Sequence, residues 1–448
     1  MLRNLALWTL LTTVWFASSA SAENWPQFRG PSARGVSSQK GLPTEWGPDK
    51  NILWKIEVPG TAWSSPVIWE NRVFLTTAVP EGQQEEPKKG LYFGGNREEV
   101  PDMVYHWRVL CFDLETGKKL WDVLAHEGKP ATAIHLKNTY ASETPVTDGE
   151  RVYAFFGSAG LYCYDFAGKL LWKRDLGAYP TRFGWGTASS PVVDDGKVFI
   201  QDDNEEKSFL VALDAKNGEE IWRDDRKEIS SWATPFVWHN GKRTELVTAS
   251  TNYVRSYDPA TGELLWKLSG MSSIAVPTPL AGDGLLYVSS GYVMDPRRPL
   301  FAIRPGATGD LTLKAEETSN SGIAWSQKHG GPYMPTPILV GQNIYVLYDR
   351  GFMACYDAAT GEPRYEKQRV GRGGSGFTAS PWSYDGKIFC LNEDGDTYVI
   401  EAGNEYKEVG KNSIDEMFMA TPAIGKNTVL LRGAKHLYAL RNLESSGK

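Results

Sequence analysis

Histidine and cysteine are scarce in this sequence, with six and four copies in 448 residues. The histidines form no zinc-binding spacing such as H-E-x-x-H, and the segment "GSAG" at 157–160 lacks the G-x-S-x-G pattern of a nucleophile elbow. A basic stripe is also missing, since the formal net charge is −6 and the sequence pI is about 5.7. These absences leave no intact zinc or hydrolase motif, and they argue against nucleic acid as a partner.

Long hydrophobic runs are missing after the N-terminus. The stretch "LALWTLLTTVWFA" follows Arg3 and is shorter than a comfortable membrane span. Ala20 and Ala22 then provide a small-x-small cleavage site, so we expect residues 1–22 to be a signal peptide, with an uncleaved anchor as the alternative. No cysteine directly follows this site. We therefore expect an exported protein, periplasmic or extracellular, with no lipid anchor and no transmembrane segment after cleavage.

What the sequence has in quantity is a repeat. Eight segments place serine or threonine before a proline at the head of an apolar run. The eight prolines are Pro66, Pro145, Pro191, Pro235, Pro279, Pro337, Pro381 and Pro422. Most neighbouring prolines lie about 40–50 residues apart, and a period of this length with several short strands predicts a β-propeller. The longer gaps contain insertions near 79–106 and 292–332.

Each repeat continues with strand-like runs and a tight turn between its third and fourth strands. The turn joins an aspartate, a glycine and, in four repeats, a tryptophan. These residues are Asp113, Gly117 and Trp121; Asp165, Gly168 and Trp172; Asp214, Gly218 and Trp222; Asp258, Gly262 and Trp266; and Asp357 and Gly361. Aspartate accepts backbone N–H groups in such a turn, and glycine supplies positive φ. We expect each tryptophan to wedge against a neighbouring blade.

The last repeat lacks a fourth strand, because "HLYALRN" is followed only by a polar tail. The segment "NILWKIEV" at 51–58 resembles a fourth strand but has no blade before it. We therefore predict that this N-terminal strand completes the last blade and closes the ring. The expected fold is all-β: an eight-bladed propeller of four-stranded blades, forming a single domain over 23–448.

Three of the four cysteines fall at one repeat position. Cys111, Cys163 and Cys355 align with residues that are small in the other repeats. Equivalent positions of different blades lie far apart in a ring, so we expect free, buried thiols rather than disulfides.

The Asp-x-x-Thr-Gly-x-x-x-Trp units and Ser/Thr-Pro strands resemble the pyrroloquinoline-quinone-like (PQQ-like) propeller repeat of quinoproteins. The segment "WPQFRGPSARGVS" at 25–37 is similar to the N-terminal arm of secreted bacterial members. The resemblance implies one of two functions. Quinoprotein dehydrogenases hold the quinone with a stacking tryptophan, calcium and an aspartate base, often beside a disulfide of adjacent cysteines, which this chain lacks. The non-catalytic branch includes the propeller of the outer-membrane barrel-assembly machinery.

A candidate ligand site follows from the residues that precede each inner strand. Two places before the proline, seven repeats have a small residue or proline, whereas the second has Glu143. We expect this carboxylate at the axial channel mouth with Arg182, Trp185, Trp63 and Trp232, where a planar or sugar-like ligand would find an aromatic collar. The alternatives stay open: a glutamate bonded to a neighbouring blade, and aromatic side chains that only pack between blades.

Two charged segments have two interpretations each. Asp202, Asp203 and Asn204 carry oxygen ligands suited to calcium, and with Glu143 they form the metal set of the dehydrogenase alternative, but acidic turns are common. The segment 297–304 contains three arginines, which predict either a solvated charged face or an anion site.

We therefore predict an exported, non-enzymatic binding or scaffold propeller without a cofactor, with a protein partner or a small polar ligand at the axial mouth, and a monomer. The alternative is a PQQ- and calcium-dependent dehydrogenase of alcohols or sugars. In that case Glu143 would ligate calcium, and Trp185 or Trp232 would stack on the quinone. A carbohydrate-binding propeller is the second alternative.

Overall fold

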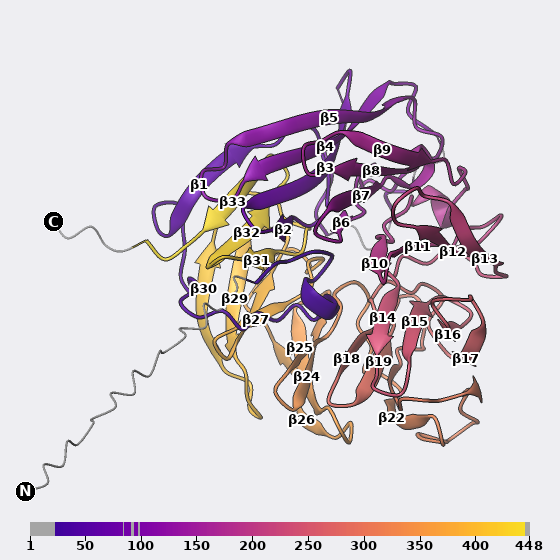
Figure 1. Cartoon of the computed structure of the whole chain (residues 1–448). Helices are drawn as coiled ribbons and strands as arrows, with labels where there is room; N and C mark the ends of the chain where they lie inside the picture. Colours follow the sequence, from indigo (N-terminus) through magenta and orange to yellow (C-terminus); the bar gives the residue numbers. More distant parts are fainter. Residues whose placement is uncertain (1–22, 84, 91–93, 97–98, 444–448) are drawn as a thin grey trace, which may run out of the picture.

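Each Ser/Thr-Pro repeat folds into one antiparallel sheet, and over the described residues eight such sheets follow one another around a common axis (Figure 1). The structure is a computed structural model that describes residues 23–83, 85–90, 94–96 and 99–443. The predicted signal peptide, residues 1–22, lies outside the described residues. The prediction of an all-β, eight-bladed propeller is confirmed.

The first four blades take their strands in chain order. Blade 1 has β2 (Val67–Trp69), β3 (Arg72–Pro80), β4 (Tyr105–Asp113) and β5 (Lys119–Gly128). Blade 2 has β6 (Val146–Thr147), β7 (Arg151–Phe155), β8 (Leu161–Asp165) and β9 (Leu170–Arg174). Blade 3 has β10 (Val192–Asp194), β11 (Lys197–Asp202), β12 (Phe209–Asp214) and β13 (Glu220–Asp225). Blade 4 has β14 (Phe236–His239), β15 (Thr244–Ala249), β16 (Val254–Tyr257) and β17 (Leu264–Leu268), with β21 (Gly309–Asp310) added in parallel.

The other blades follow the same plan. Blade 5 has β18 (Leu280–Gly282), β19 (Leu285–Ser289), β20 (Leu300–Ile303) and β22 (Ile323–Gln327). Blade 6 has β23 (Ile338–Val340), β24 (Asn343–Tyr348), β25 (Phe352–Asp357) and β26 (Pro363–Arg369). Blade 7 has β27 (Trp382–Tyr384), β28 (Lys387–Leu391), β29 (Asp396–Glu401) and β30 (Glu408–Ser413). Blade 8 has β31 (Ala423–Gly425), β32 (Thr428–Arg432), β33 (His436–Leu440) and β1 (Ile52–Glu57). Three short 3-10 turns are η1 (Pro31–Ala33), η2 (Gly157–Ala159) and η3 (Arg182–Gly184).

The N-terminal strand closes the ring, as the sequence predicts. Strand β1 pairs antiparallel with β33, with Ile52 opposite Leu440 and Glu57 opposite His436. The chain thus joins its first and last strands in one blade, which leaves no open edge between blades 8 and 1. Burial follows position within the blade: β11 is almost wholly buried because blades cover both of its faces, whereas the residues of the outer β13 are exposed or half-buried.

Tryptophans on the outer strands join successive blades. The indole N–H of Trp121 in blade 1 donates to the carbonyl of Phe166 in blade 2, with a nitrogen–oxygen distance of 2.9 Å. A Cβ built on Gly168, the turn glycine of blade 2, would lie 3.0 Å from the same indole. The same bond to the next blade is made by Trp54, Trp172, Trp222 and Trp325. The glycine is therefore needed both for its positive φ and because the neighbouring ring leaves no room for a side chain.

The closing strand takes part in this contact, because Trp54 of β1 donates to the carbonyl of Leu114 at 2.9 Å. The seam between blades 4 and 5 differs. Blade 5 has no Asp-x-x-x-Gly turn for Trp266 to meet, and this indole donates instead to Glu245 of its own blade at 2.7 Å. Strand β21, from the insertion of blade 5, covers the edge of β17 at this seam.

Both predicted insertions contain strand residues. The first extends the hairpin of blade 1, because Pro80 still pairs with Tyr105 at the ends of β3 and β4. The second contains strands β20 and β22 of blade 5 itself. All four cysteines are free and buried, in agreement with the repeat argument. No helix of the described part of the chain is long and apolar enough to cross a membrane.

Candidate functional site

The residues that precede the inner strands form the wall of a cavity on the propeller axis. Side chains alternate along an extended segment, so positions one and three before each proline share a face. Position three before the proline lines the cavity in every blade: Trp63, Ser142, Ala188, Trp232, Val276, Met334, Thr378 and Met419. Equivalent residues of eight blades can meet only at the axis. The cavity has a volume of about 420 Å³, within the usual range for ligand sites.

The hydroxyl groups directly before the prolines form a ring around this cavity, in which six of the eight neighbouring pairs are hydrogen-bonded. The backbone N–H of Ser65 donates to the hydroxyl oxygen of Thr144 in the next blade at 2.9 Å, and Thr144 N–H donates likewise to Ser190. The same bond joins Ser190 to Thr234 in the next blade. It also joins Thr278 to Thr336, Thr336 to Ser380, and Ser380 to Thr421. These bonds give the Ser/Thr-Pro motif a structural reason, since six of the eight hydroxyls satisfy a buried N–H of the blade before them.

An aromatic cluster covers one side of the cavity. The Trp185 and Trp232 rings are tilted with centroids 5.7 Å apart, and Trp185 also contacts Phe183, His135 and Tyr292. Both indoles are held in place: Trp185 donates to the Asn96 side chain and Trp232 to the carbonyl of Gly186, each at 2.7 Å. Phe183 and Met294 are large apolar side chains that stay exposed at the rim.

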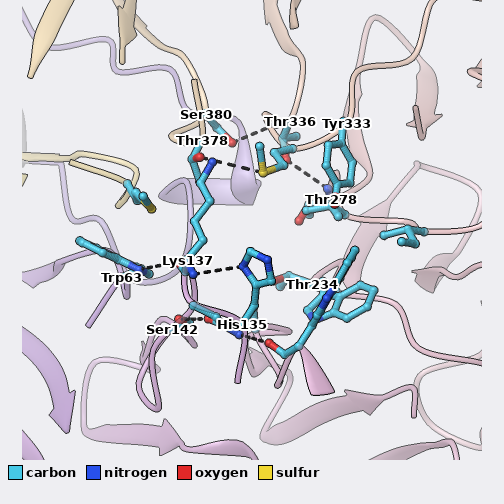
Figure 2. A pocket seen from close by; sticks show the side chains of 18 of the residues that line it. Trp63, His135, Lys137, Ser142, Thr234, Thr278, Tyr333, Thr336, Thr378 and Ser380 are labelled. Carbon is cyan, nitrogen blue, oxygen red and sulfur yellow. Dashed lines mark hydrogen bonds between the residues drawn. The ribbon is translucent and has the colours of Figure 1, made fainter. Parts of the chain in front are cut away.

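A buried ion pair crosses the opposite side. Figure 2 shows Lys137 extending toward Thr378, and its ammonium group lies 2.5 Å from the Glu393 carboxylate of blade 7. Thr378 donates to the same carboxylate oxygen at 2.7 Å. The Trp63 indole donates to the Lys137 carbonyl at 2.9 Å, which fixes the backbone of this loop. The loop before blade 2 is therefore tied to blade 7 across the mouth of the channel.

The N-terminal arm closes the cavity from below. The backbone of Trp25 pairs with Ile68 of the inner strand β2, and Phe28 lines the cavity floor. Arg29 is fully buried and donates only to backbone carbonyls, including those of Thr336, Pro337 and Pro381. Burial without a carboxylate lowers the pKa of Arg29 to about 9. The axial site is thus a pocket with a floor, not an open tunnel.

The five predicted ligand residues separate into two groups. Trp63, Trp185 and Trp232 line the cavity. Glu143 and Arg182 are not part of its lining. Arg182 lies over the ring of the neighbouring Phe183, with 5.1 Å from the guanidinium carbon to the ring centroid, and donates to the carbonyl of Ser273.

Glu143 occupies the position two before the proline, which faces away from the axis because side chains alternate. It is 2 % exposed, and its carboxylate accepts a hydrogen bond from the Thr187 hydroxyl at 2.5 Å. Burial raises the pKa of Glu143 to about 7, with a smaller contribution from the charge of Asp202. The carboxylate is therefore packed within the wall, behind the cavity.

The predicted calcium residues are engaged with one another and with blade 4. Asp203 is ion-paired with the buried Arg226 and accepts hydrogen bonds from Gln201 and Ser250. Asn204 donates to Asp202 at 3.1 Å, and burial raises the pKa of Asp202 to about 6. No group of three or more His, Cys, Asp or Glu among the described residues could hold a metal ion. These engaged side chains do not fit a calcium site.

Sequence reasoning missed several residues of the cavity. Their common feature is that they lie where the repeat pattern ends, in the N-terminal arm, in loops between blades and in the insertion of blade 5. They are Phe28, His135, Lys137, Phe183, Tyr292, Met294 and Tyr333. One signal was available in the sequence. The residue directly before Glu143 occupies position three before the proline, and the residues at this position line the cavity in all eight blades.

The ring of eight blades with these turns is that of a PQQ-like β-propeller repeat protein. A family model described as outer membrane protein assembly factor BamB matches residues 106–293 and 250–441, and the chain belongs to this family. The BamB of Burkholderia pseudomallei (strain K96243) is 23% identical over 277 residues, which cover 57% of this chain and 68% of that protein. The BamB of Yersinia pestis is 24% identical over 193 residues, 39% of this chain and 46% of that protein. The match thus spans from about half to two thirds of these relatives.

Solved structures of two kinds share the fold. BamB from Moraxella catarrhalis superposes with a TM-score of 0.57 at 11% identity, covering 89% of this chain and 98% of that chain. A europium-containing methanol dehydrogenase superposes with a TM-score of 0.61 at 10% identity, covering 92% of this chain and 90% of that chain. The quinohemoprotein alcohol dehydrogenase from Comamonas testosteroni superposes with a TM-score of 0.59 at 12% identity, covering 94% of this chain and 81% of that chain. At these identities the likeness shows the fold alone.

Proposed function

We propose that this protein is an exported, non-enzymatic scaffold whose axial cavity binds an apolar, aromatic-containing segment of a partner polypeptide. The observation that carries the proposal is the composition of the cavity wall, which combines three tryptophans with Met294, Met334 and Met419. Methionine and aromatic side chains adapt to apolar groups of varied shape. The described relatives are named as outer membrane protein assembly factors, which supports a protein partner.

The polar groups of the cavity favour a polypeptide over a sugar. No carboxylate occurs among the described lining residues, and the ammonium group of Lys137 is already paired with Glu393. Seven ring hydroxyls line the cavity, and six of them accept backbone N–H bonds. What remains accessible is mostly apolar surface with a few hydroxyl donors, which suits an aromatic side chain carried on an extended backbone.

Tryptophan fluorescence can test this function, because Trp185 and Trp232 lie in the wall. We would titrate the purified chain with an extended peptide of alternating aromatic and polar residues, and with the same peptide carrying serine in place of the aromatic residues. We expect saturable quenching by the first peptide only, and about tenfold weaker binding by Trp185→Ala. Leu170→Ala, an exposed change on the outer strand β9, is the matched control and should bind like the wild type.

Two competing ligands complete the experiment. Titration with PQQ and calcium tests the dehydrogenase alternative, and titration with mono- and oligosaccharides tests the carbohydrate alternative. Saturable binding of either, lost in Trp185→Ala, together with no response to the aromatic peptide, would overturn the proposal.

A further inference from the structure

A small cavity of about 200 Å³ lies between the N-terminal arm and the inner strands β6, β10 and β14. Its arm side consists of residues 26–28 and 32–33. Phe28 and Thr234 line both this cavity and the axial cavity, so these two side chains separate them. We call the small cavity the edge groove. It has room for a short extended segment but not for a helix, whose diameter with side chains is about 10–12 Å.

The arm already pairs with the free edges of two inner strands. In blade 1, Trp69 and Arg72 pair across a two-residue turn, so the N–H and C=O of the preceding Ile68 turn away from β3. Both of these groups bond to the backbone of Trp25, at 2.8 and 2.9 Å. In blade 7 the arm bonds in the same way to both backbone groups of Ser383, at 2.9 Å each. The edge of an inner strand is thus a place where this chain binds an extended segment.

Blades 3 and 4 present the same edge to the edge groove. Asp194 pairs with Lys197 across a two-residue turn, so the N–H and C=O of Val193 turn away from β11, and Val193 lines the groove. Val237 has the same place in blade 4, two residues after the proline, and also lines the groove. Among the described residues, no backbone group of the arm bonds to either valine. The arm-paired residues of blades 1 and 7 are at most 1 % exposed, whereas both valines are only half-buried.

The path of the arm shows how one segment can reach two neighbouring edges. Trp25 bonds to blade 1, and the next residue, Pro26, accepts the N–H of Thr147 in blade 2 at 2.9 Å. Consecutive residues of an extended chain therefore reach consecutive blades. The arm then turns inward, since Phe28 lines the floor of the axial cavity. A segment in the edge groove would continue the contact of the arm from blade 2 to blades 3 and 4, because Pro26 and Thr147 also line the groove.

We propose that the edge groove binds one extended segment of a partner polypeptide, whose backbone hydrogen-bonds to Val193 and Val237 as the arm does to blades 1 and 7. An unpaired strand edge offers donors and acceptors that match another extended backbone. The charged groups of the described lining are Asp194 and His239, which pair with each other at 3.0 Å. We therefore expect an uncharged segment with small or β-branched side chains. This site goes beyond the proposed function and does not depend on the ligand of the axial cavity.

Hydrogen–deuterium exchange, measured by mass spectrometry on the purified chain, reports where a peptide binds. The probe is a short capped peptide of alternating threonine and valine, and its control is the same peptide methylated at every backbone nitrogen. We expect the first peptide to slow exchange in residues 191–194 and 235–239, and the methylated peptide to leave exchange there unchanged. No protection of these segments at millimolar peptide, or equal protection by both peptides, would overturn the site.

A proline variant tests the edge itself. Val193→Pro removes the N–H that faces the groove but no ladder bond, because Val193 and Val198 form a non-hydrogen-bonded pair. Val193→Ala keeps this N–H and is the matched control. We expect the threonine–valine peptide to bind about tenfold more weakly to Val193→Pro than to Val193→Ala. Equal binding to the two variants would contradict the proposal. If the proline variant does not fold, the methylated peptide still decides the question on the wild type.

The two polypeptide sites can be tested separately. Trp185→Ala, a change in the axial cavity, should bind the threonine–valine peptide like the wild type. Val193→Pro should bind the aromatic peptide of the proposed function like the wild type, because Val193 does not line the axial cavity. Protection by the threonine–valine peptide that Trp185→Ala abolishes would place that peptide in the axial cavity and overturn the edge groove, while the proposed function would stand.

Discussion

The substitution Glu143→Gln should make the protein more stable at alkaline pH and leave it nearly unchanged at acidic pH. Glu143 is buried in the wall between blades, and its pKa of about 7 in the folded state exceeds the ordinary value of 4.5 because burial disfavours the carboxylate. The folded protein therefore binds this proton more tightly than the unfolded chain does. Between those two pKa values the free energy of unfolding falls as the pH rises.

The size of the effect follows from the shift. At about 1.4 kcal/mol per pKa unit, the carboxyl group lowers the free energy of unfolding by about 3 kcal/mol once the pH exceeds 7. Glutamine has the same shape, can still accept the Thr187 hydrogen bond and does not ionise. We therefore expect Glu143→Gln to equal the wild type near pH 4.5 and to exceed it by about 2–3 kcal/mol at pH 8.5.

Urea denaturation at a series of pH values measures this difference. Glu366→Gln, an exposed change on β26, corrects for the loss of one surface carboxylate. Asp202→Asn provides a second check, because the charge of Asp202 raises the pKa of Glu143. Its removal should move the pH range in which the free energy of unfolding falls to lower pH. A difference between Glu143→Gln and the wild type that does not change with pH, or a variant less stable at pH 8.5, would refute the argument.

Three further predictions concern the ring, each measured as the free energy of unfolding in urea. Gly218→Ala should lower the free energy of unfolding by about 2 kcal/mol or more, because φ is +70° and the new Cβ would lie 2.6 Å from the Trp172 ring. The control Gly196→Ala has a similar φ but open space around the new Cβ, and should cost about 1 kcal/mol. Equal losses in the two variants would contradict the packing of the tryptophan against the turn glycine. Thr144→Val removes the acceptor of a buried N–H and should cost about 1–3 kcal/mol, whereas no change would show that the hydroxyl ring is dispensable. Lys55→Pro breaks the β1–β33 ladder and should cost about 3 kcal/mol or more, against a near-neutral Lys55→Ala; a silent proline would mean that closure contributes little.

Most of the fold could be predicted because its determinants are local and repeated. Asp113 accepts the N–H of Thr116 within one turn, and Gly117 has a φ of 70° there, so the residue types themselves report the geometry. Ring closure was also predictable. The segment 51–58 resembles a fourth strand that has no blade before it, and the last blade lacks a fourth strand, so the two are expected to pair. Trp266 shows where prediction from the repeat fails. Its own blade follows the motif, but the expected contact with the next blade needs a turn that blade 5 lacks, and the indole bonds to Glu245 instead.

The site was less predictable, because many of its residues come from segments that the repeat does not describe. The distance in sequence between Lys137 and Glu393 is large, and their pairing depends on the path of an irregular loop across the channel mouth. The arm residue Phe28 reaches the cavity floor only because Arg29 anchors the arm to carbonyls of blades 6 and 7. Nothing in composition or spacing indicates either contact.

The geometry of the ring nevertheless limits where specificity can reside. Six of the eight hydroxyls before the prolines join one blade to the next, and this position contains only serine and threonine in this chain. Position two faces the blade interior and tolerates little but small residues, with Glu143 as the exception. Position three is free of both duties and contains tryptophan, serine, alanine, valine, methionine and threonine. This position, the arm, the loops between blades and the blade 1 and blade 5 insertions differ strongly around the axis, so they are the parts of the chain that can distinguish one ligand from another.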